Sequence, residues 1–259
     1  MCKKVIYPIL LAFLLSLVLP SPVRAQPVGW WRFDDGAGTT AIDSSGNGNN
    51  GTLMGGPQWV AGKIGGALRL DGTDDFVEIP HHVLLTASGE VTVMAWINTP
   101  RYGGPGGAGY QGIIAKSNNP RSYSLYTTSA GVLHFSTTSG GAYVGSTSTT
   151  QVPQNEWAHV CAMVKAGQHE YFINGQPAGT GGGGIVLPGT ADTANVLIGK
   201  TYEGSREFQG MIDDARIYMR GLTQEEIQSA MKGEGFPYVL GPTPADGAVY
   251  PDTWVSLGW

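Results

Sequence analysis

The chain has 259 residues, of which 41% are hydrophobic and 10% aromatic, so it carries enough apolar side chains for a packed core. Only 14% are charged, against about 25% in an average domain, which excludes a coiled coil, a charged tail protein and a highly charged disordered chain. The formal net charge is −5, and the 40 Gly and 16 Pro, with many Thr, Ser and aromatic residues, favour short strands joined by turns.

The first 25 residues are typical of a secretory signal peptide. Lys3 and Lys4 form a basic start, residues 9–19 are apolar, and residues 23–25 end in the small Ala25. The apolar run is shorter than the roughly 20 residues that span a bilayer, so cleavage is favoured over an uncleaved anchor. We therefore expect a secreted, extracellular or cell-surface protein with no membrane span after cleavage.

Cleavage also changes the charge and the cysteine count. Loss of Lys3, Lys4 and Arg24 lowers Lys plus Arg from 15 to 12 against 20 acidic residues, which gives a net charge of −8. This charge disfavours nucleic acid or an anionic membrane surface as a partner. Cys2 is lost as well, and Cys161 remains in an apolar run, which predicts a buried small hydrophobic side chain and no disulfide.

Between residues 28 and 218 the chain alternates short apolar runs with turn residues. Asn174-Gly175 directly follows one such run, and this dipeptide is the strongest short hairpin signal. The expected strands are residues 29–33, 67–70, 76–79, 91–97, 113–116, 123–127, 133–136, 157–165, 170–173, 196–198 and 211–218. With no helix of useful length between them, the pattern predicts a two-sheet antiparallel sandwich.

A short helix and a change of composition follow the last strand. Thr223 and Glu226 form a capping box, and Gly233 marks the end of the helix. Residues 233–244 form a Pro-rich linker, and within the following residues 245–259 the segment 253–259 alternates as a strand does. We expect the truncated start of a second β-domain there, and therefore a fragment of a larger modular protein.

Several short motifs now point to one family. They are residues 31–36, 43–53, 66–72, 75–77, 91–97, 157–160, 171–175, 210–218 and 222–227. In order and spacing they resemble the laminin-G-like (concanavalin A-like lectin/glucanase) jelly-roll domains of secreted bacterial proteins. The resemblance implies an all-β jelly roll with one short C-terminal helix over residues 26–232. The segment after the linker resembles the onset of an Ig-like or fibronectin-like module.

The resemblance also implies a structural calcium site that joins the N-terminal loop to a late strand. Calcium takes six to eight oxygen ligands. The candidate ligands are Asp34, Asp43, Asn47, Asn49, Asp213 and Asp214. Neighbours on a strand point to opposite faces, so one of Asp213 and Asp214 must face inward, where a bare carboxylate needs a cation or several donors.

Two alternatives to this site stay open. Residues 43–50 can form a series of turns with Asx caps and no ion. Residues 71–75 carry Asp71, Asp74 and Asp75, which could also bind calcium, although a tight turn between two strands is favoured.

Catalysis is tested by the spacing of the carboxylates. Retaining glucanases of this fold place acidic residues at alternate strand positions, so that they point the same way. None of the 20 acidic residues stands two positions from another. This absence favours a protein that is not an enzyme, with a glycoside hydrolase or other polysaccharide-active enzyme as the alternative.

Binding has more support, because sugar sites combine aromatic rings with a few polar groups. Tyr102 and Tyr110 lie near the ends of a Gly-rich loop over residues 101–112. A buried core does not explain the length of this loop, so we expect both rings to be exposed. Other Tyr residues lie on or beside middle strands, where packing explains them. The candidate ligand-binding residues are Tyr102, Tyr110, Arg121, Tyr202 and Arg206.

We therefore expect a non-catalytic module that binds extracellular carbohydrate or a protein ligand. A structural spacer or adhesion module is a further alternative. The sequence leaves the oligomeric state open.

Overall fold

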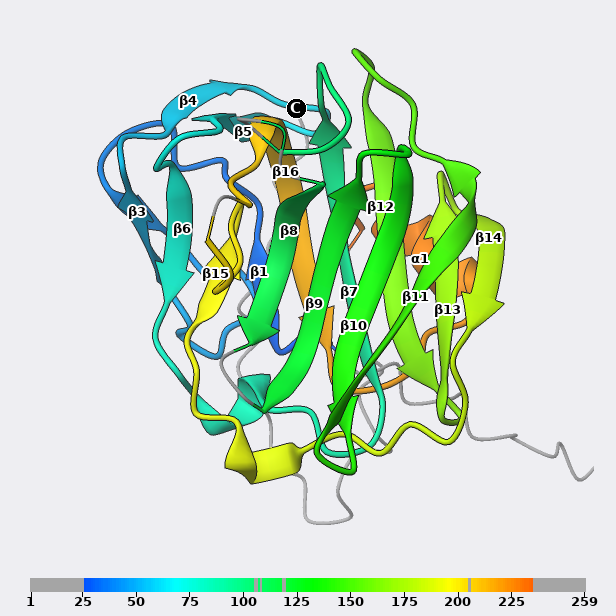
Figure 1. Cartoon of the computed structure of the whole chain (residues 1–259). Helices are drawn as coiled ribbons and strands as arrows, with labels where there is room; N and C mark the ends of the chain where they lie inside the picture. The colour runs from blue at the N-terminus through cyan, green and yellow to red at the C-terminus, as the bar shows by residue number, and fades with distance from the viewer. Residues whose placement is uncertain (1–25, 105–106, 108, 118–119, 205, 235–259) are drawn as a thin grey trace, which may run out of the picture. The chain divides into compact units, whose positions relative to one another are not determined.

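Two antiparallel sheets lie face to face in the computed structural model of the chain (Figure 1). The structure describes residues 26–104, 107, 109–117, 120–204 and 206–234. The expected signal peptide over residues 1–25, the linker beyond residue 234 and the start of a second module over residues 245–259 lie outside the described residues.

The back sheet of Figure 1 has eight strands. Their order is β14-β13-β12-β7-β16-β5-β4, and β1 pairs with β16 outside this path. The strands are β1 (Gly29–Trp31), β4 (Gln58–Ala61), β5 (Gly66–Asp71), β7 (Val91–Asn98), β12 (Ala158–Lys165), β13 (Gln168–Ile173), β14 (Gln176–Gly181) and β16 (Gln209–Tyr218).

The front sheet also has eight strands, in the order β11-β10-β9-β8-β15-β6-β3-β2. They are β2 (Thr40–Ala41), β3 (Gly51–Met54), β6 (Phe76–Ile79), β8 (Tyr110–Ser117), β9 (Arg121–Thr128), β10 (Val132–Ser139), β11 (Ala142–Gln151) and β15 (Val196–Ile198). Two 3₁₀ turns, η1 (Val83–Leu85) and η3 (Gly189–Ala191), complete the elements of this half.

The core fills the space between the sheets. Alternate residues of facing strands supply it, among them Val93 of β7, Leu125 of β9 and Ile217 of β16, all fully buried. The sequence predicts that Trp96, Trp157 and Ile217 are largely buried; this is confirmed for Trp96 and Ile217, whereas Trp157 is only half-buried. The predicted all-β sandwich is confirmed.

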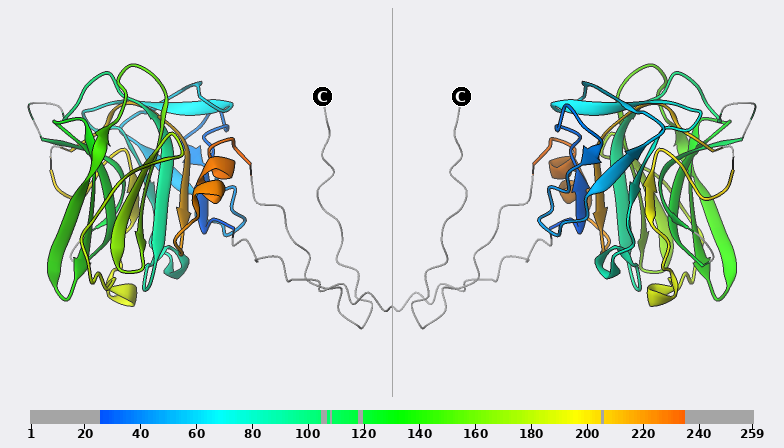
Figure 2. Two further views of the ribbon diagram at one scale, coloured as in Figure 1. Left: turned by 90° about the vertical axis from the view of Figure 1, so that its right-hand side faces the viewer. Right: turned by 90° about the vertical axis from the view of Figure 1, so that its left-hand side faces the viewer.

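One short helix, α1 (Gln224–Ala230), covers the outer side of the back sheet, as Figure 2 shows edge-on. Thr223 Oγ1 accepts from Glu226 N, and Glu226 Oε2 accepts from Thr223 N, so the predicted capping box is present. Beneath the helix a second apolar cluster includes Cys161, and burial raises the pKa of its thiol far above the usual range. The cysteine is therefore an inert core side chain, as predicted.

Local sequence patterns predicted other elements correctly but missed some of the strands. Asn174 and Gly175 both have positive φ, the conformation of a two-residue hairpin turn, and they join β13 to β14. The ten-residue β11 was not predicted, because its Ser- and Thr-rich sequence faces solvent along most of its length and shows no apolar alternation.

Thr223→Ala should lower stability, because it removes the side-chain acceptor from the start of α1. Loss of such a cap costs about 1 kcal/mol, which corresponds to roughly 2–4 °C in Tm for a domain of this size. Thermal unfolding followed by circular dichroism measures the change. Thr223→Ser keeps the hydroxyl and should melt like the parent, and an equally low Tm for the serine variant would contradict the capping role.

Candidate functional site

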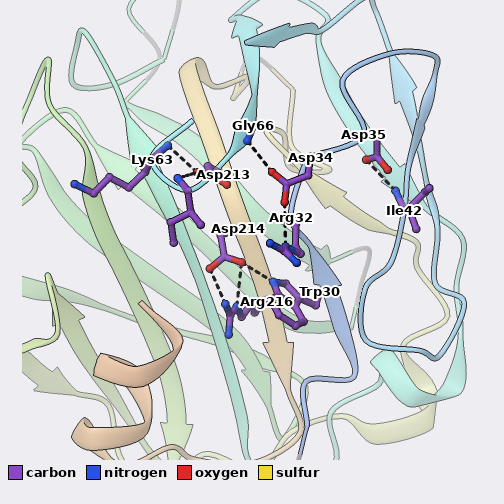
Figure 3. A network of polar contacts seen from close by, with 11 residues as sticks. Trp30, Arg32, Asp34, Asp35, Ile42, Lys63, Gly66, Asp213, Asp214 and Arg216 are labelled. Atoms are coloured by element: carbon purple, nitrogen blue, oxygen red, sulfur yellow. Dashed lines mark hydrogen bonds and ion pairs between the residues drawn. The ribbon is translucent and has the colours of Figure 1, made fainter. Parts of the chain in front are cut away.

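The candidate calcium ligands were expected on β16 and the N-terminal loop, and Figure 3 shows the polar contacts of three of them, Asp34, Asp213 and Asp214. A bulge interrupts β16, where the register shifts between Asp213 and Arg216 and Asp214 has φ of 49°. Ile212 and Ala215 point into the core, whereas both Asp213 and Asp214 are buried outside it. The expectation that one of the two aspartates faces inward is therefore wrong, because the bulge breaks strict alternation.

Asp214 already has cationic and N–H partners. Arg216 donates to its two carboxylate oxygens at 3.1 and 2.9 Å, and Trp30 Nε1 donates to Oδ1 at 2.5 Å. The Arg216 guanidinium lies 4.2 Å from the centre of the Trp30 ring. This arrangement neutralises Asp214 without a metal ion.

The loop of residues 43–50 is closed by its own hydrogen bonds. Asp43 Oδ1 accepts from Trp30 N and Ser45 N, and Oδ2 accepts from Ser45 Oγ and Asn49 N, at 2.8–2.9 Å. The side-chain amides of Asn47 and Asn49 both donate to the Val28 carbonyl. The loop has the geometry of the Asx-capped turn series that the sequence left open.

Asp213 differs from these residues because one of its oxygens has no partner. Its Oδ2 accepts from Lys63 N and Ile64 N at 2.8 Å, while its Oδ1 is buried and unbonded among the described residues. Burial, with the negative charges of Asp214 and Asp34, raises the pKa of Asp213 to about 7. An orphaned buried carboxylate oxygen of this kind is suited to a cation.

Asp34 binds the same turn as Asp213. Its Oδ1 accepts from Gly66 N at 2.7 Å, and its Oδ2 pairs with Arg32 Nε at 3.0 Å in an exposed ion pair (Figure 3). Residues 62–66 thus donate to both carboxylates. Of the six predicted metal ligands, only Asp34 and Asp213 accept hydrogen bonds from the turn of residues 62–66.

The turn between β5 and β6 is a separate acidic feature. Asp71, Asp74 and Asp75 are the only group of three metal-ligating side chains found within the described residues, with ligand atoms within 4.8 Å of one another. Asp71 Oδ1 accepts from Thr73 N, and Asp75 Oδ2 accepts from Asp71 N, so the favoured tight turn is present. The turn borders a hollow of about 830 Å³ beside β5 and β16.

A second hollow, of about 340 Å³, lies on the outer face of the front sheet. Its seven lining residues are Tyr110, Arg121, Tyr126, His134, Tyr143, Glu203 and Arg206. Tyr126 of β9 lies directly opposite His134 of β10, and their neighbours Leu125 and Phe135 fill the core. Four adjacent strands, β8 to β11 in Figure 1, and the segment after β15 therefore build this front pocket.

Three rings form the floor of the front pocket. The centroids of Tyr110, Tyr126 and His134 lie 5.5–5.7 Å apart, with edge-to-face or tilted contacts. Tyr126 is buried, whereas Tyr143, on the neighbouring β11, has 61% of its surface exposed. Burial, together with the positive charges of Arg121 and Arg206, lowers the pKa of His134 to about 4, so His134 is neutral at pH 7.

Glu203 joins the charged groups of the pocket. It pairs with Arg121, lies 3.6 Å from Arg206, and accepts from the Tyr126 hydroxyl at 3.2 Å. Arg121 Nε and one terminal nitrogen also donate to Ser117 Oγ and Ser136 Oγ, respectively. The pocket therefore holds two guanidinium groups and one carboxylate around a floor of neutral rings.

Of the predicted ligand-binding residues, Tyr110, Arg121 and Arg206 line this pocket. Tyr102 does not: its hydroxyl donates to the Val152 carbonyl at 2.6 Å and its ring packs on Gly131. Tyr102 and Tyr110 are both half-buried, so the expectation of two exposed rings is wrong. Tyr202 donates to the Asn195 carbonyl away from the pocket.

Four lining residues were not among the candidates: Tyr126, His134, Tyr143 and Glu203. The aromatic residues on successive strands gave a weak signal, which only the register between β9 and β10 resolves.

Known proteins share the fold. Domain 4 of the extracellular GH43 arabinanase AbnA from Geobacillus stearothermophilus, solved with arabinotriose, matches with a TM-score of 0.63 and 22% identity over 80% of this chain and 98% of that one. The binding domain of Paraclostridial Mosquitocidal Protein 1 matches with a TM-score of 0.66 and 15% identity over 80% of this chain and 52% of that one.

A sequence relative and a family match complete the comparison. Adhesion G-protein coupled receptor V1 of Danio rerio is 29% identical over 100 residues, which are 37% of this chain and 2% of the receptor. The family described as the concanavalin A-like lectin/glucanases superfamily matches residues 71–228, more than half of the chain. The chain therefore belongs to the concanavalin A-like lectin/glucanase superfamily.

Proposed function

We propose that this domain is an extracellular carbohydrate-binding module without catalytic activity. The observation that carries the proposal is the front pocket, where aromatic rings and convergent polar groups share one concave face. The complex of the arabinanase domain with arabinotriose supports a sugar ligand for this fold. Within the described residues, no helix has both the length and the apolarity to cross a membrane.

The enzyme alternative needs two carboxylates at one site. Glycoside hydrolysis commonly uses an acid and a second carboxylate on opposite sides of the scissile bond. Glu203 is the single carboxylate that lines the front pocket, and its oxygens are engaged by Arg121, Arg206 and Tyr126. This arrangement supports binding over hydrolysis.

The unpaired Asp213 Oδ1 supports a structural calcium ion held by Asp34 and Asp213. When bound, calcium would supply the positive charge that keeps the buried Asp213 carboxylate ionised. The exposed Arg32–Asp34 ion pair would be given up at little cost, because exposed ion pairs contribute little. Asp43 and Asp214 fit less well as ligands, since Asp43 accepts from four protein donors and Asp214 from three, against two at Asp34.

Tyr143→Ala should weaken glycan binding several-fold, because a stacked ring contributes on the order of 1 kcal/mol. Tm should stay within a degree or two, since most of the ring is exposed. A glycan array identifies the sugar, and titration calorimetry with that sugar measures the loss. Tyr202→Phe, outside the pocket, is the control and should bind like the parent. Unchanged binding by Tyr143→Ala would place the ligand elsewhere, and a silent array would favour a structural spacer.

Calcium should raise Tm after treatment with a chelator, by mass action: the gain is about 2.7 kcal/mol at a hundredfold excess over Kd. Asp213→Asn should abolish this response, because it removes the buried charge that the ion would balance. Asp74→Asn is the matched control, since it removes one acidic charge from the β5–β6 turn. Scanning calorimetry with and without calcium distinguishes the sites. A response lost in Asp74→Asn and kept in Asp213→Asn would move the ion to that turn.

A further inference from the structure

The aromatic rings of the front pocket are not bare stacking platforms. The Arg206 guanidinium lies 4.9 Å from the centre of the Tyr110 ring and 5.5 Å from that of Tyr126. The Arg121 guanidinium lies 4.6 Å from the centre of the Tyr143 ring. An arginine stacked on a ring directs its N–H donors outward in a planar fork. A ligand entering the pocket therefore meets cationic donors as well as aromatic surface.

The charge inside the pocket is positive although the chain is acidic. Arg121 and Arg206 carry two positive charges against one negative charge on Glu203, and His134 is neutral because burial and both arginines lower its pKa. The whole chain has a formal net charge of −5. The pocket thus carries the opposite sign to the rest of the protein, which favours an anionic group at this position.

The two arginines differ in how firmly they are held. Arg121 is buried, and it donates to Ser117 and Ser136 at 2.7 and 2.5 Å besides its pairing with Glu203. Arg206 has 29% of its side chain exposed, and its one ion pair among the described residues, with Glu203 at 3.6 Å, is longer than a direct hydrogen bond. Arg206 therefore retains N–H donors for a ligand, while Arg121 fixes Glu203.

We propose that the ligand of the front pocket is an acidic saccharide whose sugar carboxylate pairs with Arg206. This inference rests on the proposed function and names the class of glycan. A carboxylate matches the guanidinium fork and forms two parallel charge-assisted hydrogen bonds, which a neutral hydroxyl does not. Glu203 holds Arg206 only loosely, so the incoming carboxylate takes a place that the fold leaves accessible.

Methyl esterification provides a direct test, since it removes the charge and keeps the sugar and its linkages. Oligosaccharides of galacturonate, glucuronate and mannuronate, together with sialyllactose, are each compared with their methyl esters by calorimetry on the full chain. We expect at least one acid to bind roughly tenfold or more tightly than its ester, as charge-assisted hydrogen bonds imply. Raising the sodium chloride concentration from 50 to 500 mM should weaken binding of the acid but not binding of the ester.

Variants locate the charge effect. Arg206→Gln should lower the affinity for the acid roughly tenfold or more and leave the affinity for the ester nearly unchanged. Lys200→Gln is the matched control: Lys200 is close to Arg206 in sequence, pairs with Glu207 at 3.2 Å and does not line the pocket. It should bind both ligands like the parent. Glu203→Gln should tighten binding of the acid several-fold, because the competing carboxylate is gone.

Four results would overturn the inference. Equal affinities for acids and esters would rule out an acidic saccharide as the preferred ligand but leave the proposed function standing. Binding of neutral glycans alone would have the same consequence. Equal weakening by Arg206→Gln and Lys200→Gln would assign the effect to overall charge and not to the pocket. A folded chain that binds no glycan of either kind would remove the proposed function along with the inference.

Discussion

The buried ion pair between Asp214 and Arg216 connects both ends of the domain to the central strand β16. Arg216 stacks on Trp30 of β1 and donates to the Glu234 carbonyl beyond α1, at 2.9 Å. The two partners stand two residues apart, and the left-handed backbone at Asp214 sets the bulge that brings them together. Removal of one partner would leave a buried charge uncompensated, which typically costs about 3–5 kcal/mol. The bulge is therefore needed to keep this buried ion pair together.

The same bulge creates the unusual environment of Asp213. Its carboxylate meets the turn of residues 62–66, where a Cβ on Gly62 would lie 2.2 Å from the Gly66 carbonyl and one on Gly65 would lie 2.2 Å from Asp34. Only glycine permits this approach. Phe33, next to Asp34, also has positive φ, at 57°, so two non-glycine residues are strained at one place. Such strain persists where the surroundings fix it, and it is common at ligand sites.

Features that depend on a few neighbouring residues could be predicted from the sequence. The capping box at Thr223, the Asn174–Gly175 turn and the buried Cys161 each follow from a few neighbouring residues. The bulge at Asp214 does not, because it depends on pairing with β7 and β1. Tyr110, Arg121 and Arg206 of the front pocket were predicted, but Tyr126 and His134 were not, because these two rings meet only through strand register. Loop length predicted an exposed Tyr102, but the loop packs its ring on Gly131.

Within the described residues, the outer faces of the two sheets differ, because a helix covers one of them and not the other. Helix α1 covers the back sheet at an apolar cluster, and the front sheet presents polar and aromatic side chains at the pocket. Side chains on adjacent hydrogen-bonded strands are held in place before a ligand arrives, so less ordering entropy is lost on binding. Arg121, buried and bonded to two serines, belongs to this fixed part. Arg206 lies in the segment between β15 and β16 with 29% of its side chain exposed, so the sheet fixes Arg121 while Arg206 keeps N–H donors that the proposed ligand can reach.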